Sequence, residues 1–407
     1  MEYIKIKENG INVVFGITKD NQLKLLHFSH IDFNEEDLCR PSAECKPEEV
    51  SRREQYIQEA FQLVQVNLTG YNRPFEKHGN KHIVTAPGYL LRYVDMEDTN
   101  NEIGRKLVIT QEDTAVTKTR VVTTIQFYKG TSVVRFHNQI TNIGTEAQTL
   151  EYISSFCYTG IEKEGALSSD DKMNMWIPYN GWQKEMSWKR FSFSDLGMAQ
   201  TQPTVTQRTS QVIEVTNTGN WSTKKYLPMG YLENTEAHTS LYWQIEHNGS
   251  WHYEIGDQNN NYYLNVSGPT ELQSQWFKVL NPGESFESIP VAVGVAKDDF
   301  EVAMGELTKY RRMIRRPNRD DEELPVIFND YMNCLFGDPT TEKEFPLIDA
   351  AADSGCEYYV IDAGWYAPGE WWDSVGEWKE SKERFPNGIK EVTDYIRSKG
   401  MIAGVWL

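Results

Sequence analysis

Apolar and polar residues alternate in short runs over most of the chain, from Ile11 to about Val295. Residues 121–128 place Val, Thr, Ile and Phe on one face and the four intervening residues on the other. Lys129-Gly130 then provides a turn before a second run over residues 132–140. A period of two with turn residues between the runs is typical of β-strands. The pattern therefore predicts a long all-β region.

Residues 241–245 and 251–255 form the clearest expected hairpin. Leu, Trp and Ile alternate in the first run, Trp, Tyr and Ile alternate in the second, and Asn248-Gly249 lies between them. An Asn-Gly pair adopts the positive φ angles of a tight turn. So many strands exceed what one open twisted sheet holds, and we expect a large sandwich of two stacked sheets. Helical pattern is sparse here, apart from an expected surface helix over residues 47–56.

The pattern changes at Lys297, where Asp298-Asp299 precedes a run with helical spacing. Its apolar members are Phe300, Met304, Leu307 and Tyr310. We expect a helix that connects two domains. The polar stretch 315–323, followed by Leu324-Pro325, indicates a boundary. The expected organisation has three parts: a β domain over residues 1–297, a linker helix and boundary over 298–324, and an α/β domain over 325–407.

After Pro325 the pattern predicts three strands that alternate with two helices. The strands are expected over residues 326–328, 358–361 and 402–406, and the helices over 345–352 and 389–396. Gly355 and Gly400 stand where the two helices should end. This alternation predicts a parallel sheet whose apolar strands are buried on both faces. No glycine-rich dinucleotide fingerprint follows the first strand, which favours the start of a (β/α)8 barrel.

The charge of the chain disfavours two classes of partner. The formal net charge is −18, so phosphate backbones and anionic lipid surfaces would be repelled. The basic residues between Lys309 and Arg319 alternate with apolar ones, as in a solvated helix end. We therefore expect neither a nucleic-acid partner nor a membrane partner.

Compartment and cofactor follow from what the sequence lacks. Met1–Gly10 has no apolar core of a signal peptide, and no later window approaches the ~20 apolar residues of a membrane span. We expect a cytoplasmic location with reduced cysteines, because the five cysteines are scattered and form no CxxC pair. His78 and His82 lie among loop residues, so no metal is expected. No phosphate loop or Ser or Cys nucleophile motif is found, and no cofactor is expected.

Candidate chemistry lies just past the three expected barrel strands, because active sites of such barrels form at the C-terminal ends of the strands. These places are Asn329-Asp330-Tyr331, Asp362-Ala363-Gly364-Trp365 and Trp406. The loop after Asp362 interleaves four tryptophans with carboxylates. Indole faces stack on sugar rings while carboxylates accept hydrogen bonds from hydroxyls, so the loop predicts a neutral carbohydrate site. The alternative is that these aromatic residues only pack under the rim.

Two segments resemble glycoside hydrolase family 36, a family of retaining α-galactosidases. The first comprises Val360–Trp365, Val375–Trp378 and Arg384–Lys390, and is similar to the family's second-strand loop. The second, Ser398–Leu407, is similar to the run into its third barrel strand. The resemblance implies a multidomain β plus α/β protein, in which a large N-terminal β-supersandwich and a linker helix precede a (β/α)8 TIM barrel.

The same resemblance implies roles for four residues. Asp362 would hydrogen-bond galactosyl hydroxyls, although a carboxylate that caps its own turn is the rival role. Trp378 and Tyr331 would line the sugar subsite, and Trp406 would lie near its floor. The family places a second aspartate where this chain has Ala363. A lost buried hydrogen bond is worth about 1–3 kcal/mol, which is enough to shift substrate preference.

The residues that cleave the glycosidic bond are expected outside this chain. Retaining glycosidases use two carboxyl groups about 5–5.5 Å apart, and the resembled family carries both as aspartates on the fourth and sixth barrel strands. We expect cleavage of terminal α-linked galactose from an oligosaccharide or glycoconjugate, with no catalytic residue before Leu407 and no activity of this chain alone. The resemblance also implies a homo-oligomer.

Several alternatives stay open at this point. The chain could be a non-catalytic carbohydrate-binding or assembly module, or part of a related α-galactosaminidase or α-N-acetylgalactosaminidase. Whether it is a fragment or a natural truncation stays open too. An aromatic group in the sandwich could act as a lid or belong to the core. Its members are Trp176, Tyr179, Trp182 and Trp188.

Overall fold

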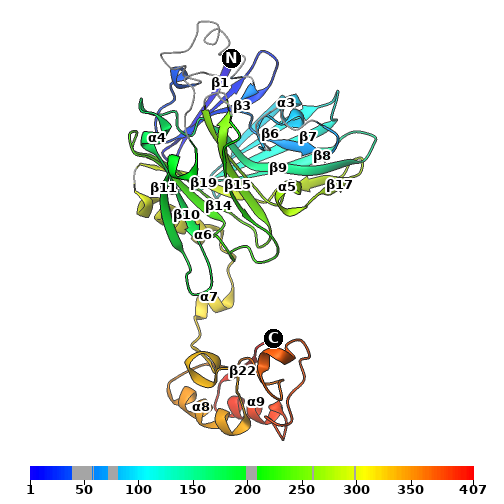
Figure 1. Ribbon diagram of the computed structural model, residues 1–407, viewed down its shortest axis with the longest axis vertical. Helices are drawn as coiled ribbons and strands as arrows, with labels where there is room; N and C mark the ends of the chain where they lie inside the picture. Colours follow the sequence, from blue (N-terminus) through cyan, green and yellow to red (C-terminus); the bar gives the residue numbers. More distant parts are fainter. Residues whose placement is uncertain (39–56, 58, 72–80, 199–208, 259–260, 298) are drawn as a thin grey trace. The chain divides into compact units, whose positions relative to one another are not determined.

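The chain folds into two compact units, Met1–Ile314 and Arg315–Leu407, drawn from blue to yellow and from yellow to red in Figure 1. The structure, a computed structural model, describes residues 1–38, 57, 59–71, 81–198, 209–258, 261–297 and 299–407. The surface helix expected over residues 47–56 lies outside these ranges. Among the described residues, no helix has the length and apolar character that a bilayer span requires.

The described residues of the N-terminal unit form three antiparallel sheets. The largest has ten strands in the order β11 (Ser187–Ser192), β10 (Met173–Tyr179), β13 (Met229–Asn234), β14 (Thr239–Ile245), β19 (Val291–Lys297), β8 (Val133–Asn142), β7 (Thr119–Phe127), β6 (Arg105–Asp113) and β5 (Arg92–Asn100), with β18 (Ser285–Glu287) paired to β8. Strand β19 thus lies inside this sheet, between β14 and β8.

The second sheet has six strands: β12 (Val212–Asn217), β15 (Trp251–Gln258), β16 (Asn261–Ser267), β9 (Gln148–Thr159) and β17 (Lys278–Leu280) in that order, with β4 (Val66–Leu68) paired to β9. The third comprises β1 (Glu2–Glu8), β2 (Ile11–Ile17) and β3 (Leu23–Ser29). Short helical turns connect them: η1 (Glu35–Asp37), α3 (Ala86–Leu90), α4 (Ser169–Lys172), η2 (Ser194–Leu196) and α5 (Glu271–Ser274).

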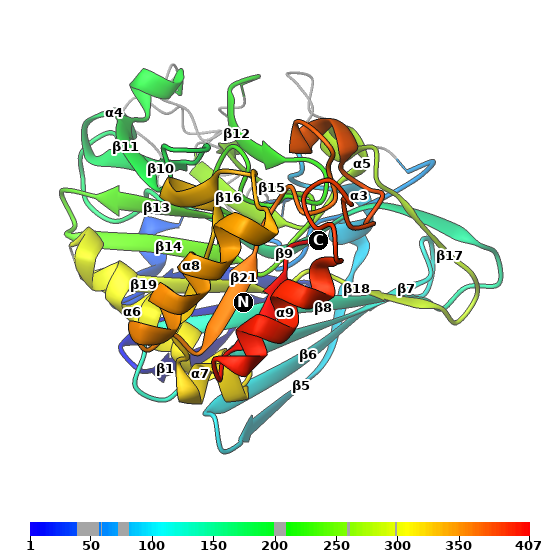
Figure 2. The ribbon, with the colours of Figure 1, turned by 90° about the horizontal axis from the view of Figure 1, so that it is seen from below.

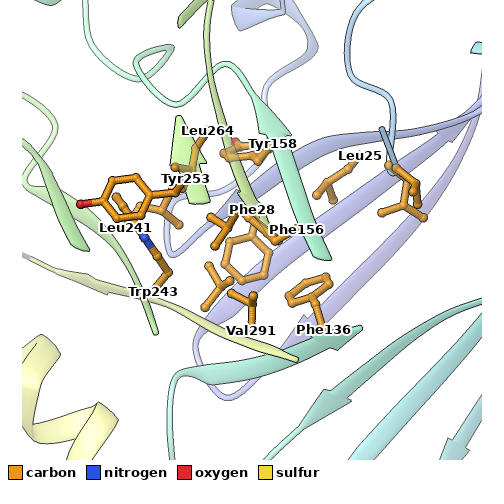
Figure 3. Close-up of a cluster of buried hydrophobic side chains, with 14 of the residues drawn as sticks. Leu25, Phe28, Phe136, Phe156, Tyr158, Leu241, Trp243, Tyr253, Leu264 and Val291 are labelled. Atoms are coloured by element: carbon orange, nitrogen blue, oxygen red, sulfur yellow. The ribbon is translucent and has the colours of Figure 1, made fainter. Parts of the chain in front are cut away.

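All three sheets contribute to one hydrophobic core (Figure 3). Phe28 of β3 contacts Phe136 of β8 and Phe156 of β9, with ring centroids 5.8 and 5.6 Å apart. Trp243 of β14 meets Tyr253 of β15 edge to face at 5.0 Å. Inward-facing residues at every second position thus interdigitate between the sheets, as sandwich packing requires. The expected sandwich is confirmed, and the three-stranded sheet is an addition to it.

The prediction of a hairpin over residues 241–255 is wrong. Strand β14 pairs with β13 and β19, whereas β15 pairs with β12 and β16 in the other sheet. Neither Asn248 nor Gly249 has a positive φ angle. The chain crosses between the sheets here, and Trp243 faces Tyr253 across the core. Alternating apolar residues fit two facing sheets as well as two neighbouring strands, so the pattern alone could not separate these arrangements.

The expected helix after Lys297 is α6 (Phe300–Ile314), which belongs to the N-terminal unit. Its buried residues Ala303, Leu307 and Tyr310 form a cluster with side chains of the ten-stranded sheet. The Asp299 carboxylate accepts a hydrogen bond from the N–H of Glu301 at 2.9 Å and caps the helix. The division of the chain at residues 297 and 324 stays a prediction; by internal packing, α6 goes with the sandwich.

The C-terminal unit has the expected strand–helix alternation. After α7 (Arg319–Glu323) come β20 (Ile327–Asn329), η3 (Tyr331–Leu335), α8 (Thr341–Asp353), β21 (Tyr358–Ile361), η4 (Trp371–Ser374), α9 (Ile389–Ser398) and β22 (Ile402–Val405). The strands are parallel in the order β20-β21-β22. Helices α8 and α9 lie side by side over the strands (Figure 2). With this sheet the predicted fold class is confirmed.

One detail of the parallel sheet differs from expectation. Ile327 and Ile402 are 57% and 54% exposed, whereas Tyr359 on the helix-covered face is fully buried. The described strands are therefore buried on one face only. The glycine positions agree with prediction, because Gly355 and Gly400 adopt φ angles of +82° and +83° where α8 and α9 end.

Candidate active site

The three parallel strands bring the predicted site residues to one edge of the sheet. Asn329 ends β20, Asp362 follows β21, and Trp406 follows β22. The N–H of Trp406 donates to the carbonyl of Ile361 at 2.9 Å, so the third strand end is tied directly to the second. Because parallel strands present their carboxyl ends on the same side, residues far apart in sequence meet here.

Three hydrogen bonds fix Asp362. One oxygen of its carboxylate accepts from the Asn329 side-chain amide at 2.7 Å, and the other accepts from the N–H of Ala363 at 2.7 Å. Its own N–H donates to Asp330 at 2.7 Å. Burial and the nearby charge of Asp362 raise the pKa of the Tyr366 hydroxyl. The capping role considered for Asp362 is therefore present, and each carboxylate oxygen retains a second lone pair that could accept a hydrogen bond from a ligand.

Aromatic rings form a continuous series beside Asp362. Trp406 meets Trp378 and Trp371 edge to face, with ring centroids 5.6 and 5.9 Å apart. Trp371 also contacts Tyr331 edge to face at 5.8 Å, and Trp378 lies nearly parallel to Trp365 at 6.3 Å. Trp378 is 37% exposed, so part of its ring is available to a ligand. The structure thus links three of the four predicted residues through ring contacts.

The loop that carries these tryptophans is tied down by Arg384, which is 9% exposed. Its guanidinium donates to the carbonyls of Ala367 at 2.5 Å and Gly369 at 2.7 Å, and to the Asp338 carboxylate at 2.5 Å. Gly364 sits at the start of the loop with φ of +103°, and a Cβ there would lie 2.2 Å from the Gly337 carbonyl oxygen. Only glycine fits this close approach.

Sequence reasoning did not assign roles to the groups that hold Asp362. Asn329 and Asp330 were named only as strand-end residues, and Glu344 of α8 was not considered. Glu344 is fully buried and shares the inner face of α8 with Ile348 and Ala351. Glu344 comes one position before the expected helix 345–352 and four residues before Ile348, so a charged residue in phase with that helix's apolar stripe is the signal that could have revealed it.

The carboxylates of the tryptophan-rich loop do not join the predicted residues. Asp373 and Glu377 line an open cavity of about 630 Å³ together with Tyr366. Lysines of the same loop pair with its acids, Lys379 with Glu377 and Lys382 with Glu380. None of the four predicted sugar-binding residues lines this cavity. Their roles in sugar binding stay a prediction that rests on the resemblance to glycoside hydrolase family 36.

A second polar cluster lies in the sandwich, where His82, His252 and Glu254 are buried. Hydrogen bonds use each ring nitrogen: His82 contacts Asn67 and Gln273, both at 3.1 Å, and His252 contacts Thr216 at 2.7 Å and Glu254 at 3.3 Å. This donor set is satisfied by protein partners and needs no ion. His78, the other member of the histidine pair considered from sequence, lies outside the described residues.

The aromatic group considered as a lid divides into two parts. Trp176 stacks on Phe300 of α6 at 4.9 Å, and Trp188 meets the same ring edge to face at 4.9 Å. These two tryptophans therefore anchor α6 on the sandwich. Trp182, by contrast, is 85% exposed in the turn between β10 and β11.

Comparison with known proteins relates both units to one group of enzymes. Residues 285–407 match the Melibiase family. The chain is 28% identical to α-galactosidase Mel36A of Lactobacillus acidophilus over 166 residues, which cover 40% of this chain and 22% of that protein. It is 31% identical to α-galactosidase AgaA of Geobacillus stearothermophilus over 134 residues, covering 32% and 18%.

Solved structures extend the likeness to the whole chain. The crystal structure of the GH36 α-galactosidase AgaA from Geobacillus stearothermophilus matches with a TM-score of 0.74 at 17% identity, over 100% of this chain and 56% of that one. The galactosidase domain of AgaSK, an α-galactosidase-sucrose kinase, matches with a TM-score of 0.71 at 16% identity, over 99% and 56%. At such identities the likeness establishes the fold.

The chain spans about a fifth of the two curated relatives and about half of the solved ones. The resemblance inferred from the strand-end motifs is confirmed by sequence relatives, by the family match and by the fold. The chain thus resembles α-galactosidases of glycoside hydrolase family 36 in sequence and in fold, and residues 285–407 carry its match to the Melibiase family.

Proposed function

We propose that this chain forms the sugar-recognition edge and the N-terminal sandwich of a retaining α-galactosidase. The observation that carries the proposal is the meeting of Asp362, Trp378 and Trp406 at the carboxyl end of a parallel sheet. A carboxylate beside partly exposed indole rings suits a neutral sugar with one apolar face. Cleavage would follow the two-carboxylate mechanism of retaining glycosidases, with both groups supplied by barrel strands that come after β22.

The proposed substrate is the terminal α-linked galactose of an oligosaccharide. AgaA variants have been solved in complex with raffinose and with stachyose, which supports this class of ligand for the fold. Asp362 would accept hydrogen bonds from galactosyl hydroxyls, Trp378 and Tyr331 would line the subsite, and Trp406 would form its floor. A homo-oligomer and a cytoplasmic location stay predictions, as does the absence of nucleic-acid and membrane partners.

The side chain of Ala363 bears on which galactoside is accepted. It is 2% exposed, so this position offers a buried methyl group where the resembled family has a carboxylate. An amino or acetamido group at C2 of the sugar would therefore face an apolar methyl group here and not a negatively charged hydrogen-bond acceptor.

The decisive experiment measures hydrolysis of p-nitrophenyl α-D-galactoside and its 2-amino and 2-acetamido analogues. Both the 407-residue chain and the product of the complete reading frame are assayed. We expect activity only in the longer protein, because the proposal assigns both catalytic carboxylates to later barrel strands. Activity of the short chain would refute that placement, and no hydrolysis of any analogue by the longer protein would refute the proposed function.

Substitution of Trp378 by alanine is expected to weaken binding of galactose about tenfold, because a stacking ring contributes about 0.5–1.5 kcal/mol beyond its buried area. Trp372→Ala is the matched control, since Trp372 is 68% exposed and its ring meets that of Trp371 edge to face. Isothermal titration with galactose on the full-length protein gives both dissociation constants. Equal losses in the two variants would contradict the placement of the subsite at Trp378.

A further inference from the structure

We propose that Asp330 and Glu344 form a carboxylic acid–carboxylate pair that positions Asp362 for the sugar. The inference rests on the proposed function for the role of Asp362. Its geometry rests on three elements of the C-terminal unit: the end of β20, helix α8 and the loop after β21.

Each carboxyl group of the pair has one oxygen bound and one oxygen without a donor. Asp330 is 2% exposed and accepts from the N–H of Asp362 at 2.7 Å with Oδ1. Glu344 is fully buried and accepts from the Tyr359 hydroxyl at 2.5 Å with Oε2. The remaining oxygens, Oδ2 of Asp330 and Oε1 of Glu344, are buried without any hydrogen-bond donor, and each carboxyl group lies close enough to the other to perturb its protonation.

A shared proton resolves this arrangement. Two ionised carboxylates in contact inside a protein are strongly unfavourable, so one of them takes up a proton. The titratable groups that face the pair are Asp362 and Tyr359 from β21 and its loop and Cys334 from η3, and none of them is basic. Among the described residues, then, no cation offsets a second negative charge beside either carboxyl.

The proton resides on Glu344. Burial and the adjacent Asp330 carboxyl raise the pKa of Glu344 to about 9. Burial also raises the pKa of Asp330, but the backbone N–H of Asp362 that it accepts favours its ionised form. Glu344 therefore donates its O–H to Oδ2 of Asp330, and each of the two orphaned oxygens gains a partner.

The result is a relay of hydrogen bonds from α8 to the sugar-binding edge. In the proposed pair, Glu344 donates to Asp330, and Asp330 accepts from the backbone N–H of Asp362. The Asn329 side-chain amide donates to the Asp362 carboxylate at 2.7 Å. Asp330 and Glu344 do not reach the sugar themselves and are positioning residues. Loss of the shared proton would place two negative charges in contact and weaken the hold on Asp362, so the orientation of Asp362 should fail above about pH 9.

Three readouts on the full-length protein test the pair. Infrared difference spectra between wild type and Glu344→Gln are expected to show a protonated carboxyl band at pH 7 that disappears above pH 9. Amide hydrogen exchange at Asp362, relative to its intrinsic rate, is expected to rise in the same range. KM for p-nitrophenyl α-D-galactoside is expected to rise about tenfold there, as for one lost buried hydrogen bond.

Two variants separate positioning from mere stability. Glu344→Gln retains an N–H donor toward Asp330 but cannot ionise, so its KM and its Asp362 exchange should stay constant from pH 7 to pH 10. Glu342→Gln changes an exposed carboxyl of the same helix and should titrate like wild type. Absence of the protonated band from the wild-type difference spectrum between pH 7 and pH 10 would overturn the pair, and this comparison needs no variant to fold.

The remaining outcomes are also distinct. A pair that titrates without any change in exchange at Asp362 would overturn the positioning role. If wild type hydrolyses no α-galactoside, the proposed function fails. The infrared and exchange measurements still test whether the two carboxyl groups share a proton and whether they position Asp362.

Discussion

Replacement of Glu254 by alanine is expected to lower the free energy of unfolding of the N-terminal unit by about 4 kcal/mol. Glu254 is fully buried. Its carboxylate accepts from the N–H of His82 at 2.7 Å, from the Tyr263 hydroxyl at 2.8 Å and from His252 at 3.3 Å. Alanine would leave these donors buried without an acceptor. Urea denaturation followed by circular dichroism measures the loss.

Acid unfolding gives an independent test of the same carboxylate. Burial alone would raise the pKa of Glu254, but the hydrogen bond from His252 and the influence of His82 and His252 prevail and lower the pKa from 4.5 to about 2. A folded-state pKa below the unfolded value stabilises the protein above pH 4.5, and this stabilisation is lost as the pH falls from 4.5 toward 2. This lowering of the pKa contributes about 3 kcal/mol to the free energy of unfolding above pH 4.5.

Two variants frame this result. Glu254→Gln has no charge to titrate and should lose this part of the acid limb of the stability curve. Glu97→Ala removes an exposed carboxylate on the edge strand β5 and should change the free energy of unfolding by less than about 0.5 kcal/mol. An acid limb in Glu254→Gln as steep as in wild type would show that other groups govern acid unfolding.

Replacement of Arg384 by alanine is expected to destabilise the C-terminal unit by about 3 kcal/mol. The carbonyls of Ala367 and Gly369 would lose a charged donor in a nearly buried setting. The Asp338 carboxylate is 55% exposed, so its share of the loss is small. Because Arg384 anchors the loop that carries Trp371 and Trp378, the loop should also exchange its amide hydrogens faster.

Lysine and a surface arginine provide the controls. Arg384→Lys should recover less than half of the loss, since one ammonium cannot span the carbonyls that the planar guanidinium reaches. Arg397→Ala removes an exposed arginine of α9 that pairs with Asp394 at 3.1 Å and should cost less than about 1 kcal/mol. Chemical denaturation combined with hydrogen exchange of peptides from each unit assigns the change. A loss below about 1 kcal/mol in Arg384→Ala would contradict the anchoring role.

The local pattern was enough to place the elements of the C-terminal unit. Short apolar runs located β21 and β22, and helical spacing located α8 and α9, whose apolar stripes are buried by their neighbours. The rule that barrel active sites form at the C-terminal ends of the strands then predicted, from sequence alone, that Asp362 and Trp406 lie close together. The sequence therefore predicted the features that depend on a single helix or strand and on the parallel order of neighbouring strands.

The local sequence pattern could not predict which strands of the sandwich pair with each other. Trp243 and Tyr253 alternate as hairpin partners would, yet they face each other from different sheets. The choice is made by long-range pairing of β14 with β19 and of β15 with β16, which leaves no local trace in the sequence. Glu344 escaped notice for a related reason, since its partner Asp330 is brought to it only by the fold.

The place of β19 has a consequence for the order in which the protein matures. It is the last strand of the sandwich in sequence, yet it lies between β14 and β8 inside the largest sheet. A nascent chain that has reached β16 already holds both neighbours, each with an unpaired edge. The sheet can close only after Lys297 leaves the ribosome, and until then those edges are open to wrong partners. Chaperone demand during synthesis should therefore peak just before β19 emerges.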